Sequence, residues 1–152
     1  MPLCSLTEKF ELPAPVEKVF HRFTNTEEII RSIPPFLRFR INRRSALRLN
    51  QGFCVEFQIR ICYLPVRCKS YVQSFSINRH FTCVLQNGWL NSWEYDCYFE
   101  PLPGNRTRVT ECVLYRLPWG WVGNLANRWL IRPCLHRIYT HHRTHLIRIF
   151  QP

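Results

Sequence analysis

The C-terminal segment from Trp121 to Phe150 restricts the fold of this chain more than any other part of the sequence. Its apolar side chains recur at steps of three and four residues, which is the spacing of one face of an α-helix. The positions on this face are Trp121, Leu125, Trp129, Leu135, Ile138, His142, Leu146 and Ile149. At a rise of about 1.5 Å per residue such a helix crosses a whole sheet. Pro133, which has no backbone N–H, predicts a bend within it.

The middle of the chain supplies such a sheet. Apolar and polar residues alternate there, as in strands that have one buried and one wet face. The runs with strand character are 37–49, 53–61, 63–76, 81–87, 93–100 and 109–117. A turn rich in proline and glycine, at 101–105, separates the last two runs. Together they predict a curved six- or seven-stranded antiparallel meander that needs a cover on one face.

The N-terminal segment predicts a strand followed by two short helices. Thr7 to Leu12 has strand character and ends at prolines, and Pro15 suits the first residue of a helix. The apolar stripe of that helix consists of Val16, Val19, Phe20 and Phe23. A second helix is expected to begin near Thr24, because Thr24 and Glu27 have the spacing of a capping box, and to end before the proline pair at 34–35.

Composition and length point to one folded domain that spans 1–152. The chain is 46% hydrophobic and 14% aromatic with only 5 Gly, which excludes a disordered or low-complexity protein. No internal repeat or linker marks a boundary. The N-terminus lacks the features of a secretory signal, and no stretch is apolar enough for a membrane span. We therefore expect a cytoplasmic protein, and attachment to the periphery of a membrane stays open.

The 8 cysteines lie scattered through the strand-like runs, at 4, 54, 62, 68, 83, 97, 112 and 134. No CxxC pair and no paired histidine spacing accompanies them, which argues against a zinc site. In a reducing compartment they are expected to be small buried apolar side chains, whereas export would allow disulfides. We expect no metal and no cofactor.

The formal charge of +11 comes mainly from arginine, because only Lys9, Lys18 and Lys69 among the 21 basic residues are lysines. Such a charge favours anionic partners. Nucleic acid, an anionic membrane surface and an anionic ligand head group would all be attracted, and charge alone does not choose among them. Because the chain has no zinc finger, RNA-recognition aromatics or helix-turn-helix, nucleic acid ranks last.

Three stretches of sequence resemble a known family. The family's opening, in which a proline-initiated helix follows strand one, is similar to LPAPVEKVFHRFTN. A glycine- and tryptophan-bearing strand pair of one bacterial subgroup resembles FTCVLQNGWLNSW. The same subgroup has an acidic residue, a V-x-Y-x-L-P-x-G block and a turn into a long helix, which TECVLYRLPWGWVGNLANRWLIRPCLHRIY resembles. With the order of elements, these stretches resemble the START/SRPBCC helix-grip superfamily, which includes polyketide cyclase/dehydrase-like and coenzyme Q-binding proteins.

The resemblance covers nearly the whole chain and implies an α+β helix-grip fold, in which the sheet wraps around the long C-terminal helix. It also implies an internal cavity for a hydrophobic ligand. Members use that cavity for lipid transfer, quinone or hormone binding, ring cyclisation and chaperoning, so the fold does not select one activity. The chain departs from the subgroup after Trp93, where relatives often carry histidines and this sequence has Glu94, Tyr95 and Cys97. The acidic position, commonly Asp, is Glu111 here.

Glu111 is the leading candidate for a chemical role. Alternation places it on the same face as Val109, Val113 and Tyr115, and this face is expected to look into the cavity. Desolvation of a carboxyl group among apolar side chains favours its neutral form, which donates a hydrogen bond or acts as a general acid. A structural ion pair with one of the many arginines is the alternative interpretation.

Aromatic residues are expected to line the ligand chamber, because aromatic walls with a few polar tips suit a flat or chain-like apolar ligand. The predicted ligand-binding residues are Phe57, Trp93, Tyr95, Glu111, Val113, Tyr115, Trp121, Leu125 and Trp129. Ordinary core packing is the alternative for each of them. Trp119 and Trp121 flank Gly120 at the start of the long helix and are candidates for a gate.

The histidines and arginines of the C-terminal segment each have two interpretations. His141 and His145 have the four-residue spacing of a metal pair, but two imidazoles without a nearby Cys, Asp or Glu make an incomplete site, and surface histidines are the simpler interpretation. The arginines form either a solvated basic face or a docking face for an anionic membrane. They are Arg128, Arg132, Arg137, Arg143 and Arg148.

Three functions stay open. The first is binding, with transport as an extension, of a hydrophobic lipid-like or polycyclic small molecule in the cavity. The second is a cyclase- or dehydratase-type enzyme in which Glu111 acts with Tyr95 or Tyr115 as acid and base. Because the sequence has no nucleophile-base-acid triad and no phosphate loop, no firm catalytic residue is assigned. The third is a basic adaptor that binds an anionic membrane or nucleic acid.

Overall fold

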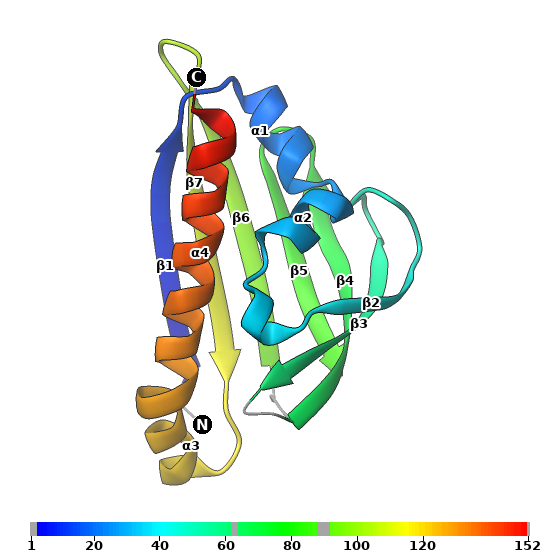
Figure 1. The fold of residues 1–152 in the computed structure, drawn as a ribbon, viewed down its shortest axis with the longest axis vertical. Helices are drawn as coiled ribbons and strands as arrows, with labels where there is room; N and C mark the ends of the chain where they lie inside the picture. The colour runs from blue at the N-terminus through cyan, green and yellow to red at the C-terminus, as the bar shows by residue number, and fades with distance from the viewer. Residues whose placement is uncertain (1–2, 62–63, 88–91, 152) are drawn as a thin grey trace.

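A curved antiparallel sheet forms the body of the protein. The computed structural model describes residues 3–61, 64–87 and 92–151, and within them one sheet of seven strands has the order β1-β7-β6-β5-β4-β3-β2. The predicted meander and its α+β helix-grip arrangement are confirmed (Figure 1). Cys62 lies outside the described residues, as do Gly88 and Trp89 of the glycine- and tryptophan-bearing stretch.

The strands alternate between an inner and an outer face. They are β1 (Leu3–Leu12), β2 (Arg40–Arg44), β3 (Cys54–Ile61), β4 (Leu64–Ser76), β5 (His80–Asn87), β6 (Ser92–Leu102) and β7 (Arg106–Arg116). β7 lies between β1 and β6, and every second residue of it is buried. These buried residues are Thr107, Val109, Glu111, Val113 and Tyr115. The predicted inner face of β7 is therefore confirmed.

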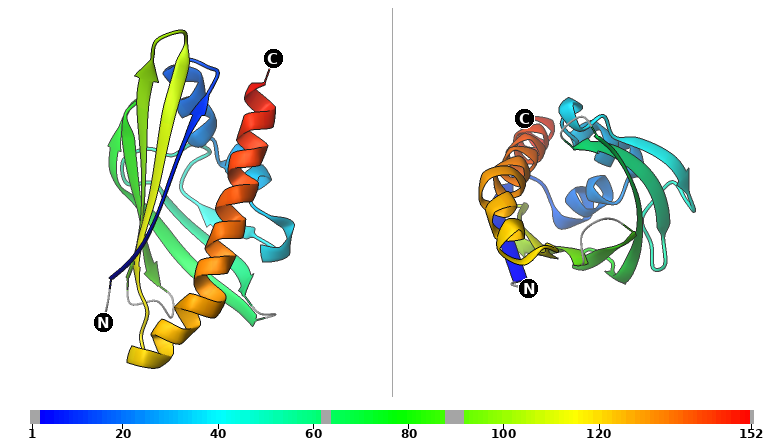
Figure 2. Two further views of the ribbon diagram at one scale, coloured as in Figure 1. Left: turned by 90° about the vertical axis from the view of Figure 1, so that its left-hand side faces the viewer. Right: turned by 90° about the horizontal axis from the view of Figure 1, so that it is seen from below.

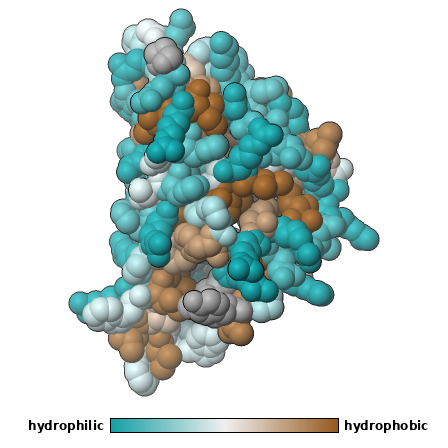
Figure 3. All heavy atoms as spheres, viewed as in Figure 1, coloured by the Kyte–Doolittle hydropathy of each residue, from teal (hydrophilic) through white to brown (hydrophobic). Residues whose placement is uncertain are grey.

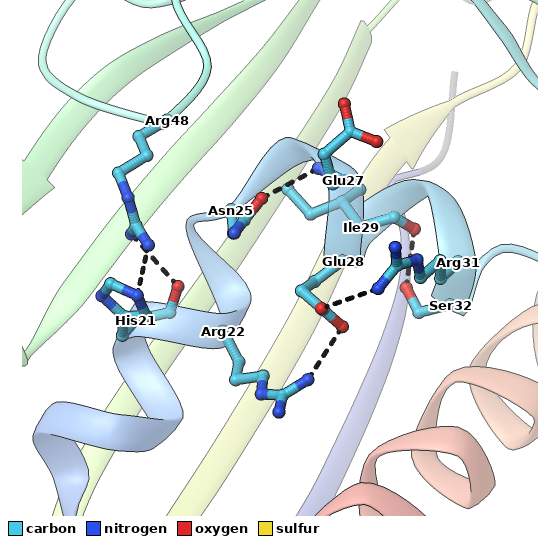
Figure 4. A network of polar contacts seen from close by, with 9 residues as sticks. All are labelled: His21, Arg22, Asn25, Glu27, Glu28, Ile29, Arg31, Ser32 and Arg48. Atoms are coloured by element: carbon cyan, nitrogen blue, oxygen red, sulfur yellow. Dashed lines mark hydrogen bonds and ion pairs between the residues drawn. The ribbon is translucent and has the colours of Figure 1, made fainter.

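Two short helices and a 3₁₀ turn follow β1. They are α1 (Val16–Phe23), α2 (Thr26–Ser32) and η1 (Pro35–Leu37). The prediction that Thr24 caps α2 is wrong, because the side chain of Asn25 accepts the Glu27 N–H at 3.0 Å (Figure 4). The Thr24 hydroxyl instead donates to the carbonyl of Phe20 at 2.9 Å. Thr24 thus closes the end of α1 and leaves the cap of α2 to its neighbour.

The C-terminal helix crosses the inner face of the sheet (Figure 1). It consists of α3 (Gly120–Ala126), a π-helical segment η2 (Asn127–Ile131) and α4 (Arg132–Phe150). Pro133 lies in the first turn of α4, directly after the π segment. Figure 2 shows the chain changing direction there, as expected beside a residue that cannot donate its backbone hydrogen bond. Among the helices of the described residues, none combines the length and the hydropathy of a membrane span.

Two clusters of buried side chains fill the two ends of the interior. The larger cluster centres on Phe20 of α1, whose ring lies edge-on to Phe75 and Phe99, with 5.4 and 5.1 Å between ring centroids. The smaller cluster includes Tyr115 of β7 and Leu135 of α4. Edge-to-face contacts of this kind add to the free energy gained from burying the rings. The larger cluster therefore anchors α1 to the sheet.

Replacing Phe20 with alanine is expected to lower the free energy of unfolding by about 3–5 kcal/mol, because it empties the centre of the larger cluster. Urea denaturation of the variant and the parent measures the difference. Ile77→Ala is the control, since Ile77 is 72% exposed and its truncation is expected to change the free energy by less than about 0.5 kcal/mol. Equal losses for the two variants would contradict this account of the core.

Candidate functional site

A chamber lies between the sheet and the C-terminal helix. It consists of an inner cavity of about 290 Å³ and an outer cavity of about 840 Å³. The two cavities adjoin, because Phe39, Phe57, Ile138 and Tyr139 contribute to the walls of both. Most of the wall side chains are apolar. The chamber has a size and a lining that are typical of a small-molecule site.

A group of polar side chains meets around Glu111 in the largely apolar wall of the inner cavity. Glu111 of β7 is only 1% exposed, and the hydroxyl of Tyr95 on the neighbouring strand β6 donates to its Oε1 at 2.7 Å. From α4, His142 brings its Nε2 to 2.9 Å from the same oxygen. Strand alternation directs Glu111 and Tyr95 inward, and the helix supplies His142 from the opposite side. We call Tyr95, Glu111 and His142 the polar cluster.

The polar cluster is not saturated with hydrogen bonds. Within the described part of the chain, Glu111 Oε2 and the Nε2 atoms of His142 and His145 are buried and make none. His142 Nε2 is close enough to Glu111 for an ion pair, but its direction does not suit a hydrogen bond. A buried acceptor without a donor costs about 1–3 kcal/mol. The inner cavity therefore offers unused hydrogen-bonding capacity to a molecule that enters it.

Burial keeps the tyrosines of the inner cavity neutral. Desolvation raises the pKa of Tyr95 well above its ordinary value, and the electrostatic effects of the neighbouring Cys97 and Glu111 raise it further. Desolvation likewise raises the pKa of Tyr139, with Glu111 as the next contribution. Both side chains are therefore neutral phenols rather than phenolates at neutral pH, and Tyr95 uses its hydroxyl as a donor.

His145 is the further titratable residue of the inner wall. Desolvation lowers its pKa from the ordinary value, and the positive charges of His142, His141 and Arg22 act in the same direction, whereas Glu28 raises it. His145 is consequently neutral at pH 7 and presents an uncharged imidazole to the cavity.

The structure brings some of the predicted ligand-binding residues into the chamber walls. Tyr95 and Glu111 line the inner cavity, Trp93 and Trp129 line the outer one, and Phe57 lines both. These residues come from β3, β6, β7 and the π segment, which are distant in sequence. The chamber thus forms only in the folded chain.

The other predicted wall residues lie elsewhere, and these expectations are corrected. Val113 and Tyr115 are buried in the smaller core cluster, where the Tyr115 hydroxyl donates to Asn127 Oδ1, and they are absent from both walls. Trp121 and Leu125 are 77% and 52% exposed and line neither cavity. The wider π turn inserts roughly one extra residue and rotates the helical phase by about 100°, so residues before it face away from the chamber.

The histidines of α4 differ from the predicted pair. His141 is exposed, whereas His142 and His145 face the inner cavity. Among residues 3–61, 64–87 and 92–151, no group of three or more His, Cys, Asp and Glu side chains is placed to hold a metal ion. The contact between His142 and Glu111 joins residues far apart in sequence. The sequence indicated this contact only through the position of His142 on the predicted apolar face of the helix.

The helix arginines have different surroundings. Arg128, Arg132 and Arg148 are exposed. Arg143 lies 3.5 Å from Glu8 of β1, and Arg137 stacks over the Phe36 ring at the wall of the outer cavity, 5.2 Å from its centroid. The basic face is thus partly engaged by the protein itself.

Comparison with known proteins gives matches to solved structures. No family model matches the sequence, and no curated protein matches it. The Zhui aromatase/cyclase from Streptomyces sp. R1128 is 11% identical, with a TM-score of 0.73 over 96% of this chain and 92% of that chain. Norcoclaurine synthase from Thalictrum flavum, a point mutant in complex with a transition state analogue, is 6% identical, with a TM-score of 0.72 over 99% and 98%. A protein from Chromobacterium violaceum is 10% identical, with a TM-score of 0.70 over 98% and 99%.

At these identities the likeness concerns the fold alone. It extends over nearly the full length of both chains in each pair. It confirms the helix-grip fold that the resemblance to the START/SRPBCC superfamily implies.

A pH titration tests the placement of His145. Its pKa is lowered in the folded state, so the unfolded chain binds a proton at about pH 6.5 that the folded chain does not. The contribution of the neutral imidazole to stability is present above that pH and is lost as the pH falls toward 5. The variant His145→Gln is expected to lose less stability than the parent between pH 7 and pH 5, as measured by urea denaturation.

His136→Gln is the matched control for this titration, because His136 is exposed on the same helix. Its loss of stability between pH 7 and pH 5 is the reference against which that of His145→Gln is compared. An NMR titration that finds the pKa of His145 at or above the ordinary histidine value would contradict the buried placement.

Proposed function

We propose that the protein binds a hydrophobic small molecule that carries one polar group. The observation that carries this proposal is an apolar chamber whose inner end holds the buried, incompletely bonded carboxyl group of Glu111. Apolar walls give affinity without direction, and a few placed polar groups fix the orientation of the ligand. The arrangement suits a lipid-like or polycyclic molecule with a polar end.

The polar cluster restricts which polar group the ligand carries. Glu111 Oε2 is an unused acceptor, and Tyr95 already donates to the other oxygen of the same carboxyl group. A ligand hydroxyl that donates to Oε2 would remove the cost of burying this acceptor alone. An alcohol or phenol is therefore the favoured ligand class.

The chamber walls favour aromatic or extended apolar skeletons. Phe39 and Phe57 contact each other at 5.0 Å between ring centroids, with a tilt of 33° between the rings, beside the junction of the two cavities, and Trp93 lines the outer one. Flat rings pack well against such walls. The Zhui protein is named an aromatase/cyclase, and the norcoclaurine synthase structure holds a transition state analogue, so similar folds accommodate small molecules. This analogy supports the binding of a small molecule and does not identify it.

Native mass spectrometry of gently purified protein is the first test. A discrete apolar compound released on denaturation, and identified after organic extraction, is the expected result. A clean mass of the protein alone, together with no rise in melting temperature with a panel of phenols, quinones, sterols and fatty alcohols, would overturn the proposal, because a ligand that binds only the folded state must raise its stability.

Filling the chamber is expected to abolish binding and to leave the fold intact. Ser70 lies in the walls of both cavities, so Ser70→Phe places a ring at their junction. At least a tenfold loss of affinity for the extracted ligand is expected, measured by titration calorimetry, because the ring occupies the volume the ligand needs (about 1.4 kcal/mol per tenfold). Ser76→Phe, at an exposed position of the same strand, is the control and is expected to bind like the parent.

Acid-base catalysis is the second candidate function. It is favoured by the convergence of Tyr95, Glu111 and His142 on one carboxyl oxygen within hydrogen-bonding distance. Glu111 would take a proton from the bound molecule through Oε2, the neutral phenol of Tyr95 would stabilise the charge on Oε1, and His142 would return a proton. Such a site suits enolisation, cyclisation or dehydration, in which protons move and no enzyme nucleophile is needed.

Glu111→Gln separates the two candidates. The amide keeps the shape of the carboxyl group but does not accept a proton, so turnover of the bound compound is expected to fall by about 10²–10⁴-fold while binding persists. Product analysis by mass spectrometry measures the turnover. Glu94→Gln, which changes an outer-face residue of β6, is the control. If the parent leaves the extracted compound unchanged, the catalytic candidate is contradicted and the binding proposal stands.

A further inference from the structure

Large apolar side chains gather on the surface at the end of the molecule that carries α3. Figure 3 shows their end of the molecule at the bottom of the view, where Figure 1 places α3, with a surface coloured brown and pale. They belong to α3 and the π segment, and each is between 42% and 77% exposed. They are Trp121, Val122, Leu125, Trp129 and Leu130. We call this set the tryptophan tip.

The tip lies in a strongly basic part of the chain. The sequence contains no Asp or Glu after Glu111, whereas Arg116, Arg128 and Arg132 lie beside the tip in sequence and are exposed. The guanidinium group of Arg128 lies over the Trp129 ring at 5.7 Å. Exposed tryptophans bordered by arginines have the composition of protein surfaces that enter the headgroup region of a bilayer. In that region the indoles reach the acyl boundary while the arginines stay with the phosphates.

We propose that the tryptophan tip docks the protein on an anionic lipid bilayer. The arginines beside the tip favour a lipid surface over a second copy of the chain, because a two-fold contact through the tip would bring the positive charges of the two copies close together. An anionic bilayer instead has negatively charged headgroups that attract the arginines beside the tip and an apolar layer that accepts the indoles of the tip.

The tip also borders the chamber. Trp129 and Leu130 belong to the wall of the outer cavity, together with Phe36 and Arg137. Docking through the tip therefore brings the outer cavity to the membrane surface, whereas the polar cluster stays at the far end of the chamber. The inference goes beyond ligand binding, since the tip docks whether or not a ligand is bound.

Vesicle sedimentation tests the proposal with the full chain. Binding is expected to vesicles of phosphatidylcholine with about a third phosphatidylglycerol, to be weak with phosphatidylcholine alone, and to fall as salt is raised from 50 to 500 mM. The double variant Trp121→Ser/Trp129→Ser is expected to lose at least about tenfold in partition coefficient, because the two indoles that would enter the bilayer are removed. Indole fluorescence of the parent should shift to shorter wavelength on binding.

Matched variants at the other end of the molecule serve as controls. Ile77→Ser and Arg79→Glu change an exposed apolar and an exposed basic residue beside the β4–β5 turn, next to the end of β6 that is remote from α3. Both are expected to bind vesicles like the parent, whereas Arg128→Glu/Arg132→Glu loses binding. Because all the changed side chains are exposed, unchanged circular dichroism and melting temperature confirm that each variant folds.

Three results would overturn the proposal. The first is equal binding of the parent and the tryptophan variant. The second is a dimer, seen by light scattering, that dissociates in the tryptophan variant while no vesicles are bound. The third is binding of an RNA oligonucleotide without binding of anionic vesicles. None of them bears on ligand binding in the chamber, which native mass spectrometry tests separately.

Discussion

The packing of α4 across the sheet is the constraint on which the rest of the structure depends. Leu135 and Leu146 are the buried residues of this helix, one in each core cluster. They are roughly 16 Å apart along the helix, and between them Ile138, Tyr139 and His142 face the chamber rather than the sheet. The helix is thus held at two points, and the curvature of the sheet leaves space between them. The packing of α4 at Leu135 and Leu146 therefore fixes the fold and also leaves the cavity between these two contacts.

The sequence predicts those parts of the structure that follow from local periodicity. The period of two placed Glu111 and Tyr95 on inner faces, because adjacent residues of a strand cannot share a face. The helical period placed His142 and Leu146 correctly after the π segment, but it failed for Trp121 and Leu125 before it. One widened turn changes the direction in which the preceding side chains of the helix point, and no local sequence pattern predicts this turn. The contact of His142 with Glu111 depends on tertiary packing, so periodicity alone did not reveal it.

The polar cluster has a cost in stability, because one carboxyl oxygen of Glu111 is buried without a hydrogen-bond donor. An apolar side chain at position 111 would pack against Tyr95 and Tyr139 without leaving a buried acceptor unpaired. The native carboxyl group is held by one phenol and approached by one imidazole, and its second oxygen is left to the cavity. Local departures from full hydrogen bonding are common where a protein uses the group for binding or catalysis. This is the physical reason to regard the chamber as a site and not as a packing defect.

The close packing around Phe20 and Phe99 and the open space at other parts of the chamber wall have an evolutionary consequence. Residues such as Phe20 and Phe99 must fit closely against one another, so substitutions there are restricted by packing. Residues of the chamber wall face space, and a change of shape at Phe57 or Trp93 alters what the chamber admits more than whether the chain folds. If the chamber binds a ligand as proposed, substitutions at such positions change its specificity without redesign of the core. The solved structures that share this fold at 6–11% identity show how far sequences can diverge around it.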